Sequence, residues 1–317
     1  MKIVVLDGHT LNPGDNPWDP LTALGDVILY DQTPDEQIVD RSREADVLVV
    51  NKIPLDEARL SQLDRLRLIA VSATGYDCVD TVAARARDIA VVNVPEYGSA
   101  SVAQHTFALL LQLCNRTAEH DAAIRAGQWQ QCGHFSFWNY SLIELAGKRM
   151  GLVGYGQIGR RVGRIAQALG MEVWVATRTP VAASEVPIRE TGLDELFSQA
   201  DVISLHCPAT PATIGLVDRG RLARVRSEAI LINTARGQLV VERDLADALN
   251  EGRLAAAGLD VMAEEPLPEE SPLRTAKNCL LTPHLAWASL AARRRLMAIT
   301  AENIKACFSN RPIHVVN

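Results

Sequence analysis

The first third of the chain alternates short apolar runs with amphipathic segments. The runs carry valine and isoleucine without polar alternation, which is typical of strands buried on both faces of a sheet. They lie at Ile3–Leu6, Val27–Tyr30, Val47–Val50, Leu68–Val71 and Ile89–Val94. Residues 35–41, 55–63 and 77–87 between them have helical character. This pattern predicts a parallel βα domain over residues 1–98, and that domain has no phosphate-binding glycine pattern.

Pro95 to Gly98 interrupts the alternation and precedes a long apolar helix, which we expect to run from Val102 to about Arg125. Phe107, Leu110 and Leu111 make the segment too hydrophobic to be solvated on every face. We therefore expect either the other domain or a second subunit to cover its apolar face.

A strand, a glycine turn, a helix and a second strand follow one another between Lys148 and Arg178. The turn reads Gly154-Tyr155-Gly156-Gln157-Ile158-Gly159. The first glycine permits the tight turn, the second lets the backbone approach phosphates, and the third lets helix and strand pack closely. A glycine turn alone is weak evidence, but this context favours a dinucleotide site over a simple packing turn.

The βα alternation continues to residue 287, and a final amphipathic helix covers residues 289–309. The further strands are expected at Val202–Leu205, Ala229–Ile232, Ala256–Leu259 and Cys279–Leu281. The fold class is therefore α/β with two doubly wound parallel-sheet domains. A C-terminal helix after a complete sheet often packs back on the first domain, but the local pattern leaves this open.

Composition excludes several classes of function. The 317 residues carry a net charge of −6 and no basic tract, which argues against nucleic-acid binding. Six cysteines are scattered without a CxxC pair, so no metal site or disulfide framework is indicated. No apolar run is long enough to span a membrane, and the N-terminus does not resemble a signal peptide. We expect a cytoplasmic protein.

Four charged or titratable residues follow predicted strands, at the edge where doubly wound sheets bind ligands: Arg236, Asp260, Glu265 and His284. Arginine binds a carboxylate through two parallel hydrogen bonds. Histidine transfers protons near neutral pH, and a nearby carboxylate orients its ring. Each residue alone has an ordinary structural explanation. Their common position beside a nucleotide turn favours a catalytic group.

With these motifs the chain resembles the D-isomer-specific 2-hydroxyacid dehydrogenase family over nearly its whole length. The matching stretches are the glycine turn, His206-Cys207-Pro208 with Thr210 and Thr213, Asn233-Thr234-Ala235-Arg236-Gly237, Gly258-Leu259-Asp260-Val261, Glu265-Pro266 and Thr282-Pro283-His284. The resemblance implies a Rossmann dinucleotide-binding domain, residues 99–287, inserted into a flavodoxin-like substrate domain made of residues 1–98 and 288–317. It also implies that Arg236 binds the substrate carboxylate and that His284, paired with Glu265, is the acid–base group.

The same resemblance implies a cofactor site and a substrate site. Cofactor-binding candidates are Gly154, Tyr155, Gly156, Gln157, Ile158, Gly159, Thr177, Arg178, Thr179, His206, Cys207, Pro208, Thr213, Thr234, Ala235, Asp260 and Ala286. Asp260 is expected at the nicotinamide end. Substrate-binding candidates are Lys52, Ala73, Thr74, Gly75, Arg236, His284 and Trp287. Judged locally, the turn around Gly75 fits a helix cap equally well, and Lys52 fits a solvated charge.

Within the family, the stretches 101–106 and 284–288 look most like the glycerate dehydrogenase, or hydroxypyruvate reductase, branch. Gln104 stands where many relatives carry glutamate, and Trp287 where many carry serine. Hydroxypyruvate or glyoxylate is the first expected substrate. The family also implies a homodimer whose interface includes the 102–125 helix.

The end of the second strand of the nucleotide motif bears on cofactor choice. NAD-specific sites usually place an acidic residue there to accept hydrogen bonds from ribose hydroxyls. This chain has Thr177-Arg178-Thr179 instead. Because Arg178 can pair with a 2′-phosphate, the sequence favours NADP(H) over NAD(H). The competing interpretation is that Arg178 only stacks on adenine and that NADH still binds.

Two other classes of protein compete with this interpretation. L-lactate and L-malate dehydrogenases place the nucleotide fold at the start of the chain, whereas here a complete domain precedes it. A catalytically idle NAD(H)-sensing protein or corepressor can use the same scaffold and retain the same residues. The acidic charge and the absence of tails disfavour that alternative.

Overall fold

The computed structural model describes all residues, 1–317, and its contacts divide the chain into two units. Unit 1 contains Met1–Gly98 and Trp287–Asn317, and unit 2 contains Ser99–Ala286. Trp287 therefore belongs to unit 1, one residue away from the boundary expected from the sequence. The chain passes from one unit to the other twice.

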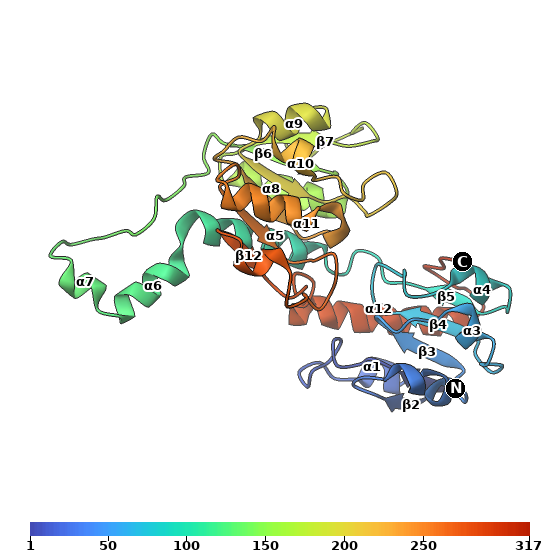
Figure 1. Ribbon diagram of the computed structural model, residues 1–317. Helices are drawn as coiled ribbons and strands as arrows, with labels where there is room; N and C mark the ends of the chain where they lie inside the picture. Colours follow the sequence, from blue (N-terminus) through green and yellow to red (C-terminus); the bar gives the residue numbers. More distant parts are fainter. The chain divides into compact units, whose positions relative to one another are not determined.

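Unit 1 is built on one parallel sheet of five strands, in the order β2-β1-β3-β4-β5 (Figure 1). The strands are β1 (Lys2–Val5), β2 (Asp26–Leu29), β3 (Val47–Val50), β4 (Leu68–Val71) and β5 (Ala90–Val92). The helical segments are α1 (Asp19–Thr22), η1 (Asp35–Gln37), α2 (Ile38–Ser42), α3 (Glu57–Leu60), α4 (Thr81–Arg85) and α12 (Leu290–Phe308). This strand order reverses direction at β1, which makes the sheet doubly wound.

Strands β1, β3, β4 and β5 are buried at nearly every position, as their apolar runs predict. The same prediction is wrong for β2, which lies at an edge of the sheet and has no buried residue. Side chains at alternate positions of β3 enter different cores, with Leu48 on one side of the sheet and Val47 and Val49 on the other. Helix α12 closes the second core with Leu296 and Ile304. Helix α12, near the C-terminus, thereby completes the domain that the N-terminal part of the chain begins.

The predicted helices over 55–63 and 77–87 are too long, because aspartates fix later starting points. Asp56 accepts a hydrogen bond from the Arg59 amide and begins α3 at residue 57. Asp80 accepts from the Val82 and Ala83 amides and begins α4 at residue 81. An N-terminal cap of this kind satisfies backbone donors that the helix itself leaves unpaired.

Unit 2 contains a parallel sheet of seven strands, in the order β12-β11-β10-β9-β6-β7-β8. The strands are β6 (Arg149–Val153), β7 (Glu172–Ala176), β8 (Arg189–Glu190), β9 (Val202–Leu205), β10 (Ile230–Asn233), β11 (Ala256–Leu259) and β12 (Cys279–Leu281). Its helical segments are α5 (Ser99–Asn115), α6 (Thr117–Arg125), α7 (Gln128–Gln131), α8 (Gln157–Ala168), α9 (Leu193–Gln199), α10 (Arg219–Leu222), η2 (Gly237–Leu239), α11 (Glu242–Asn250) and η3 (Pro272–Thr275). The order reverses between β6 and β9, and the predicted fold class is confirmed.

The predicted helix from 102 to 125 is wrong in two respects. It breaks at Arg116, whose backbone has a left-handed φ of 51°, so that α5 and α6 are separate helices. The apolar face of α5 is also largely covered by unit 2 itself. Phe107 and Leu110 are 4% and 0% exposed and belong to the same core as Met150 and Ile232. Leu111 on the same helix is 38% exposed, so unit 2 covers most of the apolar face of α5 but not all of it.

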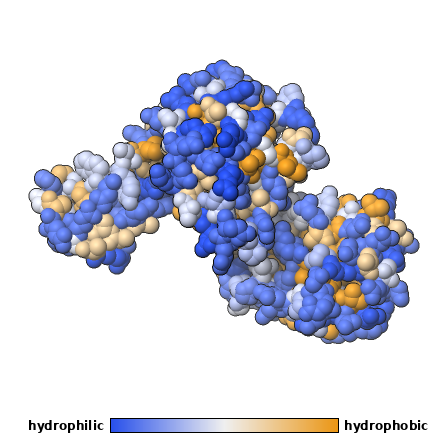
Figure 2. All heavy atoms as spheres, in the orientation of Figure 1, coloured by the Kyte–Doolittle hydropathy of each residue, from blue (hydrophilic) through white to orange (hydrophobic).

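Beyond the break, α6 and α7 have no buried residue and project from the rest of unit 2 (Figure 1). We call residues 117–142 the arm. Its large apolar side chains are exposed, and Figure 2 shows hydrophobic atoms on its visible face. They are Ile124, Trp129, Phe135, Trp138, Tyr140 and Leu142. Scattered exposed apolar residues are ordinary in proteins, whereas here six of them lie on one segment.

No helix has the length and apolar character needed to cross a membrane. No group of three or more histidine, cysteine or acidic side chains is arranged to bind a metal ion.

Candidate active site

The glycine turn between β6 and α8 has the geometry that a dinucleotide needs. Gly154 has a φ of +95°, and a Cβ there would lie 2.6 Å from the His206 carbonyl oxygen. A Cβ at Gly159 would lie 2.5 Å from the Gly154 oxygen, whereas one at Gly156 would meet nothing within 4 Å. Two glycines are therefore required by the protein's own packing, and the third borders open space.

Helix α8 begins directly after this open space, and no side chain caps its first turn. The backbone amides of Gln157 and Ile158 are among those that a helix cannot satisfy internally. They lie at the positive end of the helix dipole, which favours an anion. The residues present thus fit a bound pyrophosphate. The Tyr155 side chain is buried in the core of the unit, so any contact of this residue with the cofactor would come from its backbone.

The loop after β9 brings uncharged groups beside the glycine turn. Burial lowers the pKa of His206 to about 4, so its ring is neutral at physiological pH. Burial raises the pKa of the Cys207 thiol, which makes it a poor nucleophile. Thr213 donates its hydroxyl to the Pro208 carbonyl oxygen at 2.6 Å and accepts from the Thr210 amide. This loop is held in shape by its own hydrogen bonds.

The loop after β10 presents an arginine with no acidic partner. Asn233 holds the loop, because its amide nitrogen donates to the Arg236 carbonyl and its oxygen accepts from the Ala235 amide. Thr234 is within 3.1 Å of the Thr106 hydroxyl on α5. The half-buried Arg236 guanidinium donates only to the Ala235 carbonyl at 2.7 Å and forms no ion pair. Its charge is available to an anionic ligand.

Two strands further along the sheet, beyond the end of β12, His284 pairs with Glu265. The His284 Nδ1 atom lies 2.7 Å from Oε2 of Glu265, and the other carboxylate oxygen accepts from the Met262 amide. An ionised carboxylate can only accept, so Nδ1 carries a hydrogen and Nε2 remains for proton exchange. Both side chains are about one-third exposed, at 29% and 33%. The arrangement is that of an oriented acid–base group.

The backbone of His284 is unusual, with a left-handed φ of 52°. Its amide donates to the carbonyl oxygen of Asp260 at 2.7 Å and to that of Thr282 at 3.0 Å. Non-glycine residues adopt this conformation rarely, and they persist in it where neighbouring contacts fix it. The end of β11 therefore sets the position of the histidine.

The Asp260 side chain is fully buried, and its contacts are made within unit 2. Oδ1 accepts from the Thr282 hydroxyl at 2.6 Å and the Leu285 amide at 2.9 Å. Oδ2 accepts from the Ala286 amide at 2.9 Å. A contact with a cofactor, as expected from the sequence, would have to use the remaining capacity of Oδ2.

His105 on α5 is a member of this network that the sequence analysis missed. Its Nε2 lies 3.0 Å from the Thr282 hydroxyl and 3.5 Å from Oδ1 of Asp260. Because the threonine hydrogen goes to the aspartate, His105 Nε2 is the donor. Ser101, one helical turn earlier, donates to the Ala286 carbonyl at 2.6 Å. The signal available in the sequence was the polar pair at positions 101 and 105 of an apolar helix.

The pKa of Asp260 is lowered from its usual value. Burial works in the opposite direction and favours the neutral acid, but the hydrogen bonds from His105 and Thr282 and from the Ala286 and Leu285 amides outweigh it. The carboxylate is therefore ionised at neutral pH although it is fully buried.

Thr177, Arg178 and Thr179 follow β7, the strand next to β6, and all three are exposed. Arg178 has no hydrogen-bond or ion-pair partner within the protein. Its position at the carboxyl end of a strand beside the glycine turn is the one that the fold uses to contact the adenosine ribose.

The remaining substrate candidates belong to unit 1. Ala73 is buried, while Thr74 and Gly75 form the turn after β4, and the Thr74 hydroxyl donates to the Val94 carbonyl. Trp287 packs edge-on against Tyr97, with ring centroids 6.3 Å apart. The structure thus places them at strand ends or at the unit boundary, as expected.

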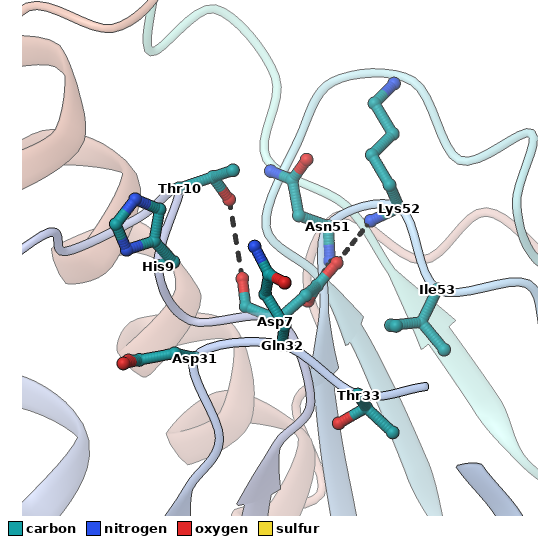
Figure 3. Close-up of a pocket in the computed structure, with 9 residues that line it drawn as sticks. All are labelled: Asp7, His9, Thr10, Asp31, Gln32, Thr33, Asn51, Lys52 and Ile53. Carbon is teal, nitrogen blue, oxygen red and sulfur yellow. Dashed lines mark hydrogen bonds between the residues drawn. The ribbon is translucent and has the colours of Figure 1, made fainter. Parts of the chain in front are cut away.

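Lys52 lies at the rim of a cavity of about 320 Å³ in unit 1 (Figure 3). The cavity is lined by the segments that follow β1, β2 and β3. Burial raises the pKa of Asp7 at its floor, although the carboxylate accepts from the Lys52 and Asn51 amides. Those bonds fix the backbone at position 52, and the lysine side chain extends away from the other labelled residues (Figure 3).

Comparisons with known proteins agree with this geometry. A family model described as "D-isomer specific 2-hydroxyacid dehydrogenase, NAD binding domain" matches residues 107–286. A hydroxypyruvate reductase of Blautia hydrogenotrophica is 46% identical over 100% of both chains. A glycerate dehydrogenase of Methylorubrum extorquens is 37% identical over 89% of this chain and 88% of its own. The solved structure of an acyclic imino acid reductase in complex with NADPH and D-Arg has a TM-score of 0.85, 28% identity and 100% coverage of both chains.

The buried network gives a prediction about Asp260. Replacing it with asparagine should lower the free energy of unfolding by about 1–3 kcal/mol, because an amide NH₂ replaces an oxygen that accepts from backbone amides. Chemical denaturation monitored by circular dichroism measures this loss. Asp64→Asn is the matched control, since Asp64 is exposed and has no partner.

The pH dependence of that difference follows from the lowered pKa of Asp260. A depressed pKa contributes stability above the unfolded value of about 3.9, and this stability is lost as the pH falls through the folded value. The difference in the free energy of unfolding between wild type and Asp260→Asn should therefore persist from neutral pH to about pH 4 and become smaller below that pH. Equal stability of Asp260→Asn and Asp64→Asn at neutral pH would contradict this account.

Proposed function

Because the chain belongs to the D-isomer specific 2-hydroxyacid dehydrogenase family, we propose that it reduces hydroxypyruvate or glyoxylate to the corresponding 2-hydroxy acid with NADPH. Membership makes it an oxidoreductase with a nicotinamide dinucleotide cofactor. The substrate, the choice of NADPH and the residue roles below are our proposal.

One observation carries the proposal. The sheet that holds the glycine turn also carries an unpaired arginine after β10 and an oriented histidine–glutamate pair after β11 and β12. These three strands are neighbours, and the carboxyl ends of parallel strands meet at one edge of a sheet. A cation for a carboxylate and a proton donor for a carbonyl are the groups that the reduction of a 2-oxo acid requires.

In this mechanism Arg236 binds the substrate carboxylate and helps to polarise the neighbouring carbonyl group. Its fork of donors matches a carboxylate through two parallel hydrogen bonds. Since it has no internal acid to release, substrate binding does not break an existing ion pair. The interaction also fixes which face of the carbonyl carbon is presented for reaction.

A nicotinamide cofactor held at the glycine turn between β6 and α8 would supply a hydride for the carbonyl carbon. As that bond forms, His284 donates the hydrogen on Nε2 to the carbonyl oxygen, and the product is a hydroxyl group. The imidazolium is thereby converted to neutral imidazole, and the reverse reaction begins from the neutral ring. Glu265 holds Nδ1–H throughout and stabilises the charged form of the ring.

The relatives support a small substrate. The full-length relative is named a hydroxypyruvate reductase, and another is named a glycerate dehydrogenase, which denotes the same pair of compounds. We include Ala73, Thr74, Gly75, Lys52 and Trp287 in the substrate site as part of the proposal. The turn at 73–75 would contribute backbone amides to the carboxylate.

NADPH is proposed because of the residues at the end of β7. Thr177-Arg178-Thr179 lacks the acid that would accept hydrogen bonds from ribose hydroxyls and repel a phosphate. Arg178 is exposed and has no partner, so it is able to pair with a 2′-phosphate. A structurally similar acyclic imino acid reductase binds NADPH, which shows that this fold accepts it.

We also propose a homodimer, and we assign its interface to the arm. The α5 helix has most of its cover within unit 2, but the arm exposes Trp138 at 67% and Phe135 at 92%. Aromatic side chains are enriched at the centres of protein interfaces because they bury a large area. A second copy of the chain is the occupant that the family suggests.

A panel of 2-oxo acids tested with both cofactors checks the proposed activity. In an assay of cofactor absorbance, we expect kcat/KM to be higher for hydroxypyruvate or glyoxylate than for pyruvate and phenylpyruvate. We also expect kcat/KM to be higher with NADPH than with NADH. Equal or better turnover with NADH would overturn the cofactor assignment. Cofactor binding without turnover of any 2-oxo acid would instead support a sensing protein.

The role of His284 predicts a separation between chemistry and binding. His284→Gln should lower kcat by about 10²–10⁴, the usual contribution of a positioned acid–base group. The dissociation constant for the cofactor, measured by fluorescence titration, should stay within about twofold, since the side chain contacts Glu265 rather than the glycine turn. His134→Gln on the arm serves as the control. Retention of most of the kcat by His284→Gln would exclude the proposed role.

Analytical ultracentrifugation tests the proposed dimer. The wild type should sediment with twice the mass of one chain, and Phe135→Ser combined with Trp138→Ser should shift it toward the monomer. Val82→Ser removes a comparably exposed side chain, 79% exposed, from unit 1 and should leave the mass unchanged. A wild type that is monomeric at all concentrations would rule out the dimer.

A further inference from the structure

The segment that carries Arg178 is long and has no regular structure of its own. Residues 177–188 connect β7 to β8. Both ends are fixed by the sheet, but twelve connecting residues have many conformations available unless contacts select one. An arginine on such a segment discriminates between ligands only if the segment is held in place.

Three contacts hold its middle, and they reach three consecutive residues. The Tyr155 hydroxyl lies 2.8 Å from Oγ of Ser184. Arg160 donates from Nη1 to the Ala183 carbonyl oxygen at 2.6 Å. Arg164 forms an ion pair with Glu185 at 2.5 Å. We call this set of contacts the clasp.

All three groups on the other side of the clasp belong to the glycine turn and its helix. Tyr155 is the second residue of the turn, and Arg160 and Arg164 are one helical turn apart on α8. The Tyr155 ring is buried, and a Cβ at Gly163 would lie 3.3 Å from it, so α8 fixes its position. The Arg160 guanidinium lies 4.9 Å from the centre of the same ring. The clasp is therefore anchored to the element whose N-terminus faces the cofactor phosphates.

The charges at the clasp also favour an anion. Arg164 neutralises Glu185, the acid on the clasped residues. Arg160 contacts a neutral carbonyl and the face of a ring, and it has no acidic partner. Two cationic side chains thus contact residues 183 and 185, and elsewhere on the segment the Val181 amide donates to the Glu190 carboxylate at 3.2 Å.

We propose that Tyr155, Arg160 and Arg164 are positioning residues that hold residues 183–185, and through them Arg178, so that they set the preference for NADPH over NADH. This rests on the proposed function of Arg178 as the partner of the 2′-phosphate. The clasp residues act through the segment and need not touch the cofactor.

Two measurements test the clasp, and the first does not depend on any cofactor. Hydrogen exchange of the backbone amides of residues 177–188 in the free protein should be faster in Ser184→Ala and Arg160→Gln than in the wild type. Arg161→Gln is the matched control, because Arg161 is exposed on the same helix and has no partner. Unchanged exchange in both clasp variants would overturn the clasp itself, whichever cofactor the protein prefers.

The second measurement is the affinity for NADP⁺ and NAD⁺, by isothermal titration calorimetry. Each clasp variant should weaken NADP⁺ binding by about two- to tenfold, the effect of losing one hydrogen bond, and NAD⁺ binding by less than about twofold. Tyr155→Phe combined with Ser184→Ala should bind NADP⁺ no more weakly than Ser184→Ala alone, since Ser184→Ala already removes the bond to Tyr155, together with the weaker one from the Val186 amide. Two results would show that the clasp does not set the cofactor preference. One is faster amide exchange in residues 177–188 with an unchanged ratio of NADP⁺ to NAD⁺ affinity. The other is an equal loss of affinity for both cofactors.

An error in the proposed cofactor preference can be distinguished from an error in the clasp. If the wild type binds NAD⁺ more tightly than NADP⁺, the assignment of Arg178 is wrong, and with it the selectivity role of the clasp. The exchange measurement then still decides whether residues 183–185 are held by α8.

Discussion

A fully buried carboxylate organises the edge of unit 2 that carries the proposed catalytic residues. Asp260 receives backbone and side-chain donors from the segment after β12, while its own carbonyl accepts from the His284 amide. An isolated ionised carboxylate in an apolar core would be very costly, so it is stable there only because each of its oxygens is hydrogen-bonded. That requirement fixes Thr282, Leu285 and Ala286, and the unusual backbone of His284 between them is a consequence. The acid–base group is therefore positioned by an electrostatic demand of the core beneath it.

Helix α5 contacts the loops that follow β10 and β12 and holds them in position. Ser101, His105 and Thr106 contact the Ala286 carbonyl, Thr282 and Thr234, which belong to the segments after β12 and β10. The opposite side of the helix is apolar and lies in the core. One helix thus uses its apolar residues for stability and its polar residues for loop position. A loop that is braced in this way holds its side chains in place without closing over the ligand.

The sequence predicted the strands and the glycine turn well, but it did not predict the break between α5 and α6. Buried parallel strands were predicted within a residue or two, because both-sided burial demands continuous valine and isoleucine runs such as Val47–Val50. The glycine turn was readable from its three-glycine pattern, and the structure shows a steric reason for two of them, Gly154 and Gly159, while Gly156 borders open space. The helix break at Arg116 was not, since arginine is a good helix former and its left-handed backbone comes from tertiary context.

His105 was missed for a related reason: its partner Thr282 is 177 positions away, and no local pattern reports such a contact. The cover of α5 was misjudged similarly, because an apolar face shows that something must bury it but not which element does so.

Arginine chemistry links the two ends of the proposed ligand site. The protein is acidic overall, with a net charge of −6, yet the proposed ligands are anions, so their attraction to the protein must be local. Arg164 is already paired with a carboxylate, and Arg160 is held by a carbonyl and a ring. Arg236 and Arg178 have no such acidic partner and stand at the ends of β10 and β7. A paired arginine stabilises the position of a segment, whereas an unpaired one at a strand end keeps its charge for a ligand. Because Arg160 also lacks an acidic partner, the absence of an acid does not by itself separate the two roles. The position at the carboxyl end of a strand is what sets apart Arg236 and Arg178, the arginines proposed to bind ligands.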